Sequence, residues 1–342
     1  MRTALVTTTI NVPHVLRLYR RADPDVRFFV AVDKKTPDLD QFCAEIGNAQ
    51  WNAMGHGDIV WKCGPLIGWN CIQRRNIATL EALRWGADLI VFVDDDNIPA
   101  RFGCYFGDYQ YAMGYPSPAG PRFSGLLASP EVDWFDVGAF LDPPSSHRGF
   151  PHQFAHRKPR LSHVVDAKIG ACAGIVLGDP DISAVTRIAR APHVLNVSPL
   201  LNAGIAVNPR HTRTVFNTQN SAVIRDLAPA MLLCPQFKRY DDIIASLVCQ
   251  RVMADTGYHV LFGPPFVYQE RNAHDLGRDL ADEAWGQAHI LDVQAALWRT
   301  VTSHSPDICG AVQKLYYALD ILMPGVGDLA EAWIEDCRSA MA

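Results

Sequence analysis

Several signatures of well-known enzyme classes are missing from this 342-residue sequence. Residues 7–13, in and after the first predicted strand, read Thr-Thr-Thr-Ile-Asn-Val-Pro and contain no G-x-G-x-x-G, so a flavin-binding dinucleotide fold is not expected. No G-x-x-x-x-G-K-[ST] occurs either, which argues against P-loop phosphoryl transfer. H-E-x-x-H and C-x-x-C are also absent, which argues against a zinc site.

Long apolar runs and a strong charge of one sign are lacking as well. No apolar run approaches the roughly 18 residues of a membrane span, so we expect neither a signal peptide nor a membrane-spanning helix. The formal net charge of −5 gives no reason to expect nucleic acid or an anionic membrane as a partner. The nine cysteines are scattered and odd in number, which indicates reduced thiols and predicts a cytoplasmic protein.

The most informative stretch is the five-residue apolar run 89–93, which leads directly into Asp94, Asp95 and Asp96. Such a run, rich in β-branched residues, predicts a buried strand of a parallel sheet. Because burial of unpaired carboxylates is costly, the three aspartates are expected to face a counter-charge. At the carboxyl end of a strand they predict a site for Mg²⁺ or Mn²⁺, completed by water and substrate phosphates. The alternative is an acidic loop in which Asp96 or Asn97 caps the next element.

Other predicted strand ends carry polar side chains. Thr8 and Thr9 end the first strand and suit hydrogen bonding to a nucleotide base or ribose, although β-propensity alone would also explain them. Asp33 stands at the tip of the second strand. An acid at that edge commonly accepts bonds from a base or ribose, and the alternative is a turn residue.

Charges at two helix starts are also informative. Arg74 and Arg75 fall in the first turns of a predicted helix beside the acidic strand, whereas cations are normally favoured at helix carboxyl ends. They therefore indicate an anionic partner, either the aspartates or a diphosphate, with a solvated face as the alternative. Asp241 and Asp242 open another helix, where the helix dipole alone would explain one of the two acids.

The order of elements predicts an α/β fold with a mixed sheet and helices on both faces. The predicted core strands cover residues 4–10, 28–32, 89–93, 171–177 and 258–262. We expect the site at their carboxyl ends. Three helical patterns (279–301, 307–323 and 327–341) predict a C-terminal helical region for packing or self-association, so that a homo-oligomer could form through it.

Three motifs resemble those of a known family. They are Asp94-Asp95-Asp96, Arg148-Gly149-Phe150-Pro151 followed by Phe154-Ala155-His156-Arg157, and Arg239-Tyr240-Asp241-Asp242. Together they resemble the plant reversibly glycosylated polypeptides, which are UDP-arabinopyranose mutases, and the related bacterial NDP-sugar pyranose mutases. The resemblance runs roughly from residue 3 to residue 275, with two extra residues before Arg157. It implies a glycosyltransferase-A-like (Rossmann-like) catalytic domain for nucleotide sugars over residues 1–275. The three helical patterns that follow predict a helical appendage over 276–342, which the resemblance does not cover.

The resemblance also implies roles for individual residues. The family's acidic DXD motif falls on Asp94 to Asp96 and implies Mn²⁺ or Mg²⁺ together with ribose–diphosphate, without flavin. The reactive or sugar-handling arginine falls on Arg157, and the catalytic acids fall on Asp241 and Asp242. Plant members have a histidine where this chain has Gln269, so that role passes to His274, to water or to nothing. The metal candidates are Asp94, Asp96 and His274. The nucleotide-sugar-binding candidates are Thr8, Thr9, Asp33, Arg74, Arg75, Asp94, Asp95 and Asn220, the last just before a helix predicted to break at Pro229.

The reaction implied is an isomerase reaction, the metal-dependent interconversion of the pyranose and furanose forms of a nucleotide sugar. The bacterial relatives imply a GDP-hexose such as GDP-fucose, and the plant relatives imply a UDP-arabinose-type substrate. Two alternatives stay open: a glycosyltransferase that moves the sugar to an external acceptor, and a non-catalytic nucleotide-sugar-binding scaffold. Two roles also stay open for Arg157, which would either clamp the diphosphate or transiently accept the sugar.

Overall fold

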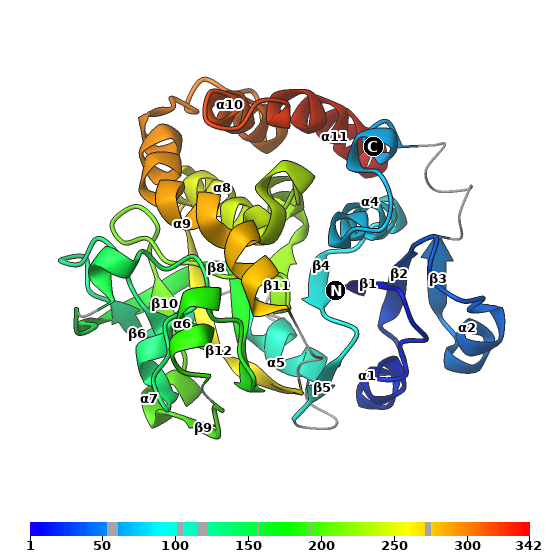
Figure 1. Ribbon diagram of the computed structural model, residues 1–342, viewed down its shortest axis with the longest axis horizontal. Helices are drawn as coiled ribbons and strands as arrows, with labels where there is room; N and C mark the ends of the chain where they lie inside the picture. Colours follow the sequence, from blue (N-terminus) through cyan, green and yellow to red (C-terminus); the bar gives the residue numbers. More distant parts are fainter. Residues whose placement is uncertain (53–60, 101–104, 115–121, 156, 192, 271–274) are drawn as a thin grey trace.

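A large mixed sheet runs through the molecule, with helices on both of its faces (Figure 1). The computed structural model describes residues 1–52, 61–100, 105–114, 122–155, 157–191, 193–270 and 275–342. Within these residues, ten strands form the sheet. The predicted α/β class and the predicted C-terminal helical region are both confirmed.

Four parallel strands form one half of the sheet. In spatial order they are β3 (Ala49–Asn52), β2 (Arg27–Val32), β1 (Thr3–Thr9) and β4 (Leu89–Val93). The helical segments between them are α1 (Leu16–Ala22), α2 (Asp40–Ile46), α3 (Gly64–Ile67), η1 (Ile72–Arg74) and α4 (Arg75–Trp85). The strands predicted at 4–10, 28–32 and 89–93 are thereby confirmed, and their carboxyl ends meet at one edge.

The other half of the sheet is mixed. Its strands are β11 (Asn220–Ile224), β8 (Leu161–Gly178), β6 (Phe123–Ala128), β10 (Ile205–Val207), β12 (Tyr258–Gln269) and β5 (Asn97–Pro99). Strand β11 lies antiparallel between β4 and β8, whereas β8 and β12 run parallel to each other. Strand β8 also pairs with β6, β6 with β10, and β10 with β12, so these four strands close a ring.

One prediction in this half is wrong. The residues after Asn220 form strand β11 and then the 3-10 helix η4 (Arg225–Ala230), which contains Pro229, instead of an α-helix broken at that proline. The five residues of β11 pair with every residue of β4. Pairing with a distant strand decides the structure of this short segment, and local sequence does not reveal that pairing.

Alternate side chains of the central strands enter two separate cores. In β4, Leu89, Val91 and Val93 belong to one core, and Ile90 and Phe92 belong to the other. This two-residue period is the geometry of a strand buried on both faces, as the uninterrupted apolar run predicts.

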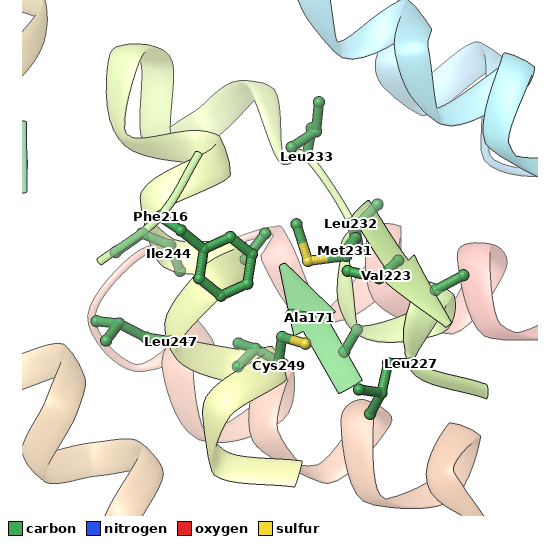
Figure 2. Close-up of a cluster of buried hydrophobic side chains, with 14 of the residues drawn as sticks. Ala171, Phe216, Val223, Leu227, Met231, Leu232, Leu233, Ile244, Leu247 and Cys249 are labelled. Atoms are coloured by element: carbon green, nitrogen blue, oxygen red, sulfur yellow. The ribbon is translucent and has the colours of Figure 1, made fainter. Parts of the chain in front are cut away.

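Helices cover both cores. Helices α1, α2 and α5 (Tyr105–Ala112) pack on the face of Leu89 and Val91, while α4 and α8 (Asp241–Thr256) pack on the face of Ile90. Figure 2 shows part of the second core, to which Ala171 of β8 and Leu247 of α8 both belong. The remaining short elements are η2 (Val137–Phe140), β7 (Leu141–Asp142), η3 (His152–Phe154), α6 (Ala184–Ala189), β9 (Asn196–Val197), α7 (Pro199–Asn202) and η5 (Pro235–Tyr240).

The C-terminal region consists of three helices, as predicted. They are α9 (Leu276–Arg299), α10 (Ile308–Asp320) and α11 (Val326–Met341). Their fully buried side chains, among them Val293, Leu315 and Trp333, join the same core as α4 and α8. The three helices after residue 275 therefore share a core with elements that precede it. In the described part of the chain, no helix is both long and apolar enough to span a membrane.

Candidate functional site

A cleft of about 440 Å³ opens at the carboxyl edge of the parallel strands. Thr8 and Thr9 reach it from the end of β1, Asp94 to Asp96 from the end of β4, and Gln269 from the end of β12. Thr218 reaches it from the residues just before β11, because the amino end of an antiparallel strand lies at this same edge. The cleft lies at the edge of the sheet where the sequence predicts a site.

The three aspartates after β4 each have a different partner. Nη2 of Arg75 donates to Oδ1 of Asp94 at 2.7 Å, the hydroxyl of Thr9 donates to Asp95, and the amide of Gln269 donates to both oxygens of Asp96 at 3.2 Å. Burial raises the pKa of Asp94, an effect that Arg75 opposes, and burial raises the pKa of Asp95, an effect that Thr9 opposes. We call this group the acidic cluster.

A second charged group, the Arg148 cluster, lies in the same cleft. The guanidinium of Arg148 donates to both oxygens of Asp181 and, through Nη2, to Oδ1 of Asp242 at 3.1 Å. Burial alone would lower the pKa of Arg148, but the two carboxylates raise it well above its usual range, so the guanidinium stays charged. Burial raises the pKa of Asp242, and the charge of Arg148 opposes that shift.

Thr218 connects the two clusters. Its carbonyl and hydroxyl oxygens accept hydrogen bonds from Nη1 of Arg75, and its amide donates to Oδ2 of Asp242. The acidic cluster and the Arg148 cluster are therefore neighbours in the cleft, with Thr218 between them.

A glycine brings Arg148 to this position. Gly149 has a φ of 85°, in the left-handed region, and a Cβ placed there would lie 2.3 Å from Cγ2 of Ile243 in α8. Only a residue without a side chain both adopts this conformation and allows the loop to approach α8 so closely. Because Ile243 directly follows Asp242, this approach sets Arg148 beside the Asp242 carboxylate.

The structure brings together seven of the predicted residues. These are Thr8, Thr9, Arg75, Asp94, Asp95, Asp96 and Asp242, all of which line the cleft. Predicted residues that do not line it are Asp33, Arg74, Arg157, Asn220 and Asp241. His274 lies outside the described residues.

Arg157 is not part of the cleft. Its side chain is exposed and its guanidinium lies 4.3 Å from the centre of the Phe154 ring. Arg148, nine positions earlier in the same loop, occupies the cleft instead. The two residues share a motif, so sequence spacing alone does not separate them, whereas the packing of Gly149 on α8 does.

Asp33 and Arg74 contact other parts of the protein instead of lining the cleft. The buried carboxylate of Asp33 accepts hydrogen bonds from the amides of Lys34 and Cys71, and thereby anchors the turn that leads into α4. Arg74 is buried in η1, with its guanidinium 4.0 Å from the centre of the Trp69 ring. Of the two neighbouring arginines, only Arg75 faces the acidic cluster.

Asn220 is a structural residue of the sheet. Its Oδ1 accepts hydrogen bonds from the hydroxyls of Tyr105 and Tyr109, and its Nδ2 donates to the carbonyls of Ile175 and Pro265. The side chain is buried and lies outside the cleft, so it offers no free polar atom to a nucleotide.

Replacing Asn220 with alanine is therefore expected to affect stability and not ligand affinity. The change leaves several buried polar groups without a partner, each costing about 1–3 kcal/mol, so we expect the free energy of unfolding to fall by about 3 kcal/mol or more. Urea unfolding measures this loss, and calorimetry on the folded fraction measures nucleotide affinity. A variant of unchanged stability with weakened nucleotide binding would contradict this assignment.

Asp241 lies behind Asp242. One of its oxygens accepts from Nε2 of Gln73 and the other from the amide of Asp242. Burial, and then the charge of Asp242, raise the pKa of Asp241 to about 7. Asp242 therefore lines the cleft directly, while Asp241 lies behind it and places no side chain in the cleft.

The free energy of unfolding should depend on pH because Asp241 titrates at a different pH in the folded and unfolded states. An aspartate titrates at about 3.9 when unfolded, so between that value and about 7 the folded state binds the extra proton. The contribution of Asp241 is complete below about pH 4 and is lost as the pH rises through about 7. Urea unfolding in steps across this range should show a steeper fall with pH in the wild type than in Asp241→Asn; parallel profiles would contradict the raised pKa.

Several residues of the site were missed by sequence reasoning. They are Arg148, Asp181, Thr218, Gln219, Arg239 and Gln269. Arg148 and Arg239 stand within the motifs that carry the family resemblance, so a signal was present for both. Asp181 lies outside these motifs, just before helix α6, whose N-cap is Ser183.

The acidic cluster suits a cation such as Mg²⁺ or Mn²⁺ that is only partly coordinated by the protein. Among the described residues, no three or more His, Cys, Asp or Glu side chains are grouped as a protein-only metal site. Mg²⁺ and Mn²⁺, however, are commonly held by one or two carboxylates together with water and substrate phosphates. Five aspartates and only three arginines line the cleft, so an anionic ligand would need a cation beside it. Asp94 and Asp96 are the residues that could hold one.

Comparison with protein-family models finds no match for the chain, and comparison with curated proteins finds none either.

Proposed function

We propose that the protein is a divalent-metal-dependent mutase that interconverts the pyranose and furanose forms of a nucleotide-diphosphate sugar. The observation that carries the proposal is one cleft at the carboxyl edge of the sheet in which three aspartates adjoin two buried, charged arginines. This is an arrangement for holding a diphosphate and a cation next to acid/base groups. The antiparallel strand β11 between β4 and β8 supports a glycosyltransferase-A-like sheet. The proposed substrate is a GDP-hexose or a UDP-pentose.

Each cluster has its own part in the reaction. Breaking the anomeric C–O bond places charge on the diphosphate, and a cation held by Asp94 and Asp96 would offset that charge. Arg75 fixes Asp94 through its ion pair and adds a permanent positive charge at the same place. Because this pair is preformed, no reorganisation is needed when the charge develops.

The diphosphate must rebond to the anomeric carbon after the sugar ring has reopened and reclosed through a different hydroxyl. That exchange takes a proton from the attacking hydroxyl and returns one to the oxygen that leaves the ring. Asp242 is the carboxylate positioned for this, since it lines the cleft and is held by Arg148 and the Thr218 amide. Arg148 stays protonated, and a protonated guanidinium has no free electron pair, so its role is electrostatic and not that of a sugar acceptor. Of the two roles that the resemblance implies for Arg157, the electrostatic one is therefore proposed for Arg148.

The decisive experiment uses no acceptor. Purified protein is incubated with a panel of UDP- and GDP-sugars and Mn²⁺ or Mg²⁺, the products are separated by anion-exchange chromatography, and the ring form is read by NMR. A new peak of identical mass with furanose couplings is the expected result. Release of free nucleoside diphosphate, or turnover only with an added acceptor, would replace the mutase with a glycosyltransferase. Binding without any turnover would leave a nucleotide-sugar-binding scaffold.

A further inference from the structure

Helix α9 holds the segment that leads into Asp242. It packs against η5, α6 and α8 (Figure 1). A Cβ at Gly286 would lie 2.1 Å from Cγ of Tyr240, so glycine is required for α9 to lie against this ring. Lys238 in the same segment has a φ of 50°, a conformation that persists in a non-glycine residue only when its surroundings hold it, and its Nζ pairs with Asp282 of α9 at 2.9 Å.

A buried carboxylate stands at the centre of this contact. Glu283 of α9 is fully buried, with Oε1 accepting from Nε of Arg239 at 3.0 Å and Oε2 accepting from the amide of Ala184 at 2.8 Å. A buried carboxylate requires a counter-charge, which Arg239 supplies. Asp279, one turn earlier in α9, lies 3.3 Å from Nη1 of the same guanidinium.

Glu283 thereby connects two segments that build the cleft. Asp181 lies in the segment just before Ala184, and Asp242 lies three residues after Arg239. The carboxylate of Glu283 therefore holds both segments that supply acids to the Arg148 cluster. Arg239 itself lines the cleft and a quarter of its side chain is exposed. Its contacts with Glu283 and Asp279 engage Nε and Nη1 of the guanidinium.

The surroundings of Arg239 favour a neutral ligand group over a phosphate. Two carboxylates of α9 already compensate the charge of its guanidinium, so it attracts an anion weakly but keeps N–H groups to donate. The acidic cluster is the proposed place of the diphosphate. The part of the ligand that extends from there toward Asp242 is the sugar.

We propose that Arg239 is a sugar-binding residue that donates hydrogen bonds to ring hydroxyls, and that Glu283 is its positioning residue. The inference rests on the proposed nucleotide-sugar function and makes α9 part of the site. A hydrogen bond from a charged donor contributes about 1.5–3 kcal/mol, which corresponds to roughly a 10- to 100-fold change in affinity.

Calorimetry with two probes tests this without turnover. GDP and GDP-fucose, and UDP and UDP-arabinose, are titrated in the presence of Mn²⁺ into the wild type and into Arg239→Ala. We expect affinity for the nucleotide sugar to fall by about 10- to 100-fold, while affinity for the matching nucleoside diphosphate stays within about twofold. Equal losses for both probes, or no loss for either, would overturn the sugar-binding role.

A double-substitution cycle tests Glu283. The Glu283→Gln side chain keeps the shape but presents a neutral amide to Arg239, so affinity for the nucleotide sugar should fall by about tenfold. The double variant should bind no worse than Arg239→Ala, because Glu283 acts through Arg239; additive losses would overturn the positioning role. Asp292→Asn, which removes an exposed carboxylate of the same helix, is the matched control and should bind like the wild type.

The same set of variants shows whether a loss of affinity comes from misfolding. Arg239→Ala leaves Glu283 without its counter-charge, whereas the double variant removes both charges and should recover stability. If Arg239→Ala does not fold, Arg239→Lys replaces it, since lysine keeps the charge but lacks the planar donor geometry. A wild type that binds neither probe would overturn the proposed function as well. A wild type that binds the diphosphate and gains nothing from the sugar would overturn only this inference.

Discussion

Replacing Arg148 with alanine is expected to abolish turnover and to lower the free energy of unfolding by about 3–5 kcal/mol. The change leaves Asp181 and Asp242 buried next to each other without their shared counter-charge. It also removes the charge that opposes the upward shift of the Asp242 pKa, so that carboxylate would hold its proton at higher pH and lose its function as a base. Urea unfolding and the acceptor-free mutase assay measure the two effects.

Two companion variants make this result specific. Arg157→Ala removes an exposed arginine of the same loop and should change stability by less than about 0.5 kcal/mol, with turnover close to wild type. Arg148→Lys keeps a charge between the two aspartates but cannot donate to both in a planar fork, so it should recover much of the stability and little of the turnover. If Arg157→Ala were inactive and Arg148→Ala active, the assignment of the cleft arginine would be reversed.

The second large effect is expected at the acidic cluster. Asp96→Ala should lower turnover by at least about 100-fold, because a lost cation no longer offsets charge on the diphosphate. Asp96 is partly exposed and accepts hydrogen bonds from the neutral amide of Gln269, so the free energy of unfolding should change by less than about 1 kcal/mol. Mn²⁺ binding, followed by electron paramagnetic resonance, should weaken in parallel with activity.

Asp94→Asn is the matched comparison. It removes the charge that compensates the buried Arg75, so it should destabilise the fold as well as weaken Mn²⁺ binding. Retention of wild-type Mn²⁺ affinity in Asp96→Ala would remove Asp96 from the metal site. Turnover that survives chelation of all divalent metal in the wild type would remove the metal from the proposed function.

The positions of the main strands and of the acidic cluster could be predicted because the signals are local. The run from Leu89 to Val93 is apolar on both faces of a strand, and the abrupt change to Asp94 marks where that strand leaves the core. Parallel strands bring their carboxyl ends to one edge whatever their exact packing, so Thr9 and Asp95 could be expected near each other.

The roles of other residues depended on distant partners. Asn220 was taken for a ligand residue, but pairing of β11 with β4 turns its amide toward two tyrosines and away from the cleft. The contribution of α9 was missed for the same reason, since nothing near Glu283 in the sequence indicates that it meets Arg239. A polar side chain has no periodic pattern that reveals its contact across the fold.

The sequence by itself determined the fold class, the edge of the sheet at which the cleft opens, the acidic cluster and the three C-terminal helices. These features follow from hydrophobic periodicity and from spacing over a few residues, which act within each element. Only the tertiary structure decided that Arg148 and not Arg157 enters the cleft, and that α9 holds Arg239. Those outcomes depend on side-chain packing between segments far apart in the chain, such as Gly149 against Ile243, where steric fit at a single atom selects one arrangement.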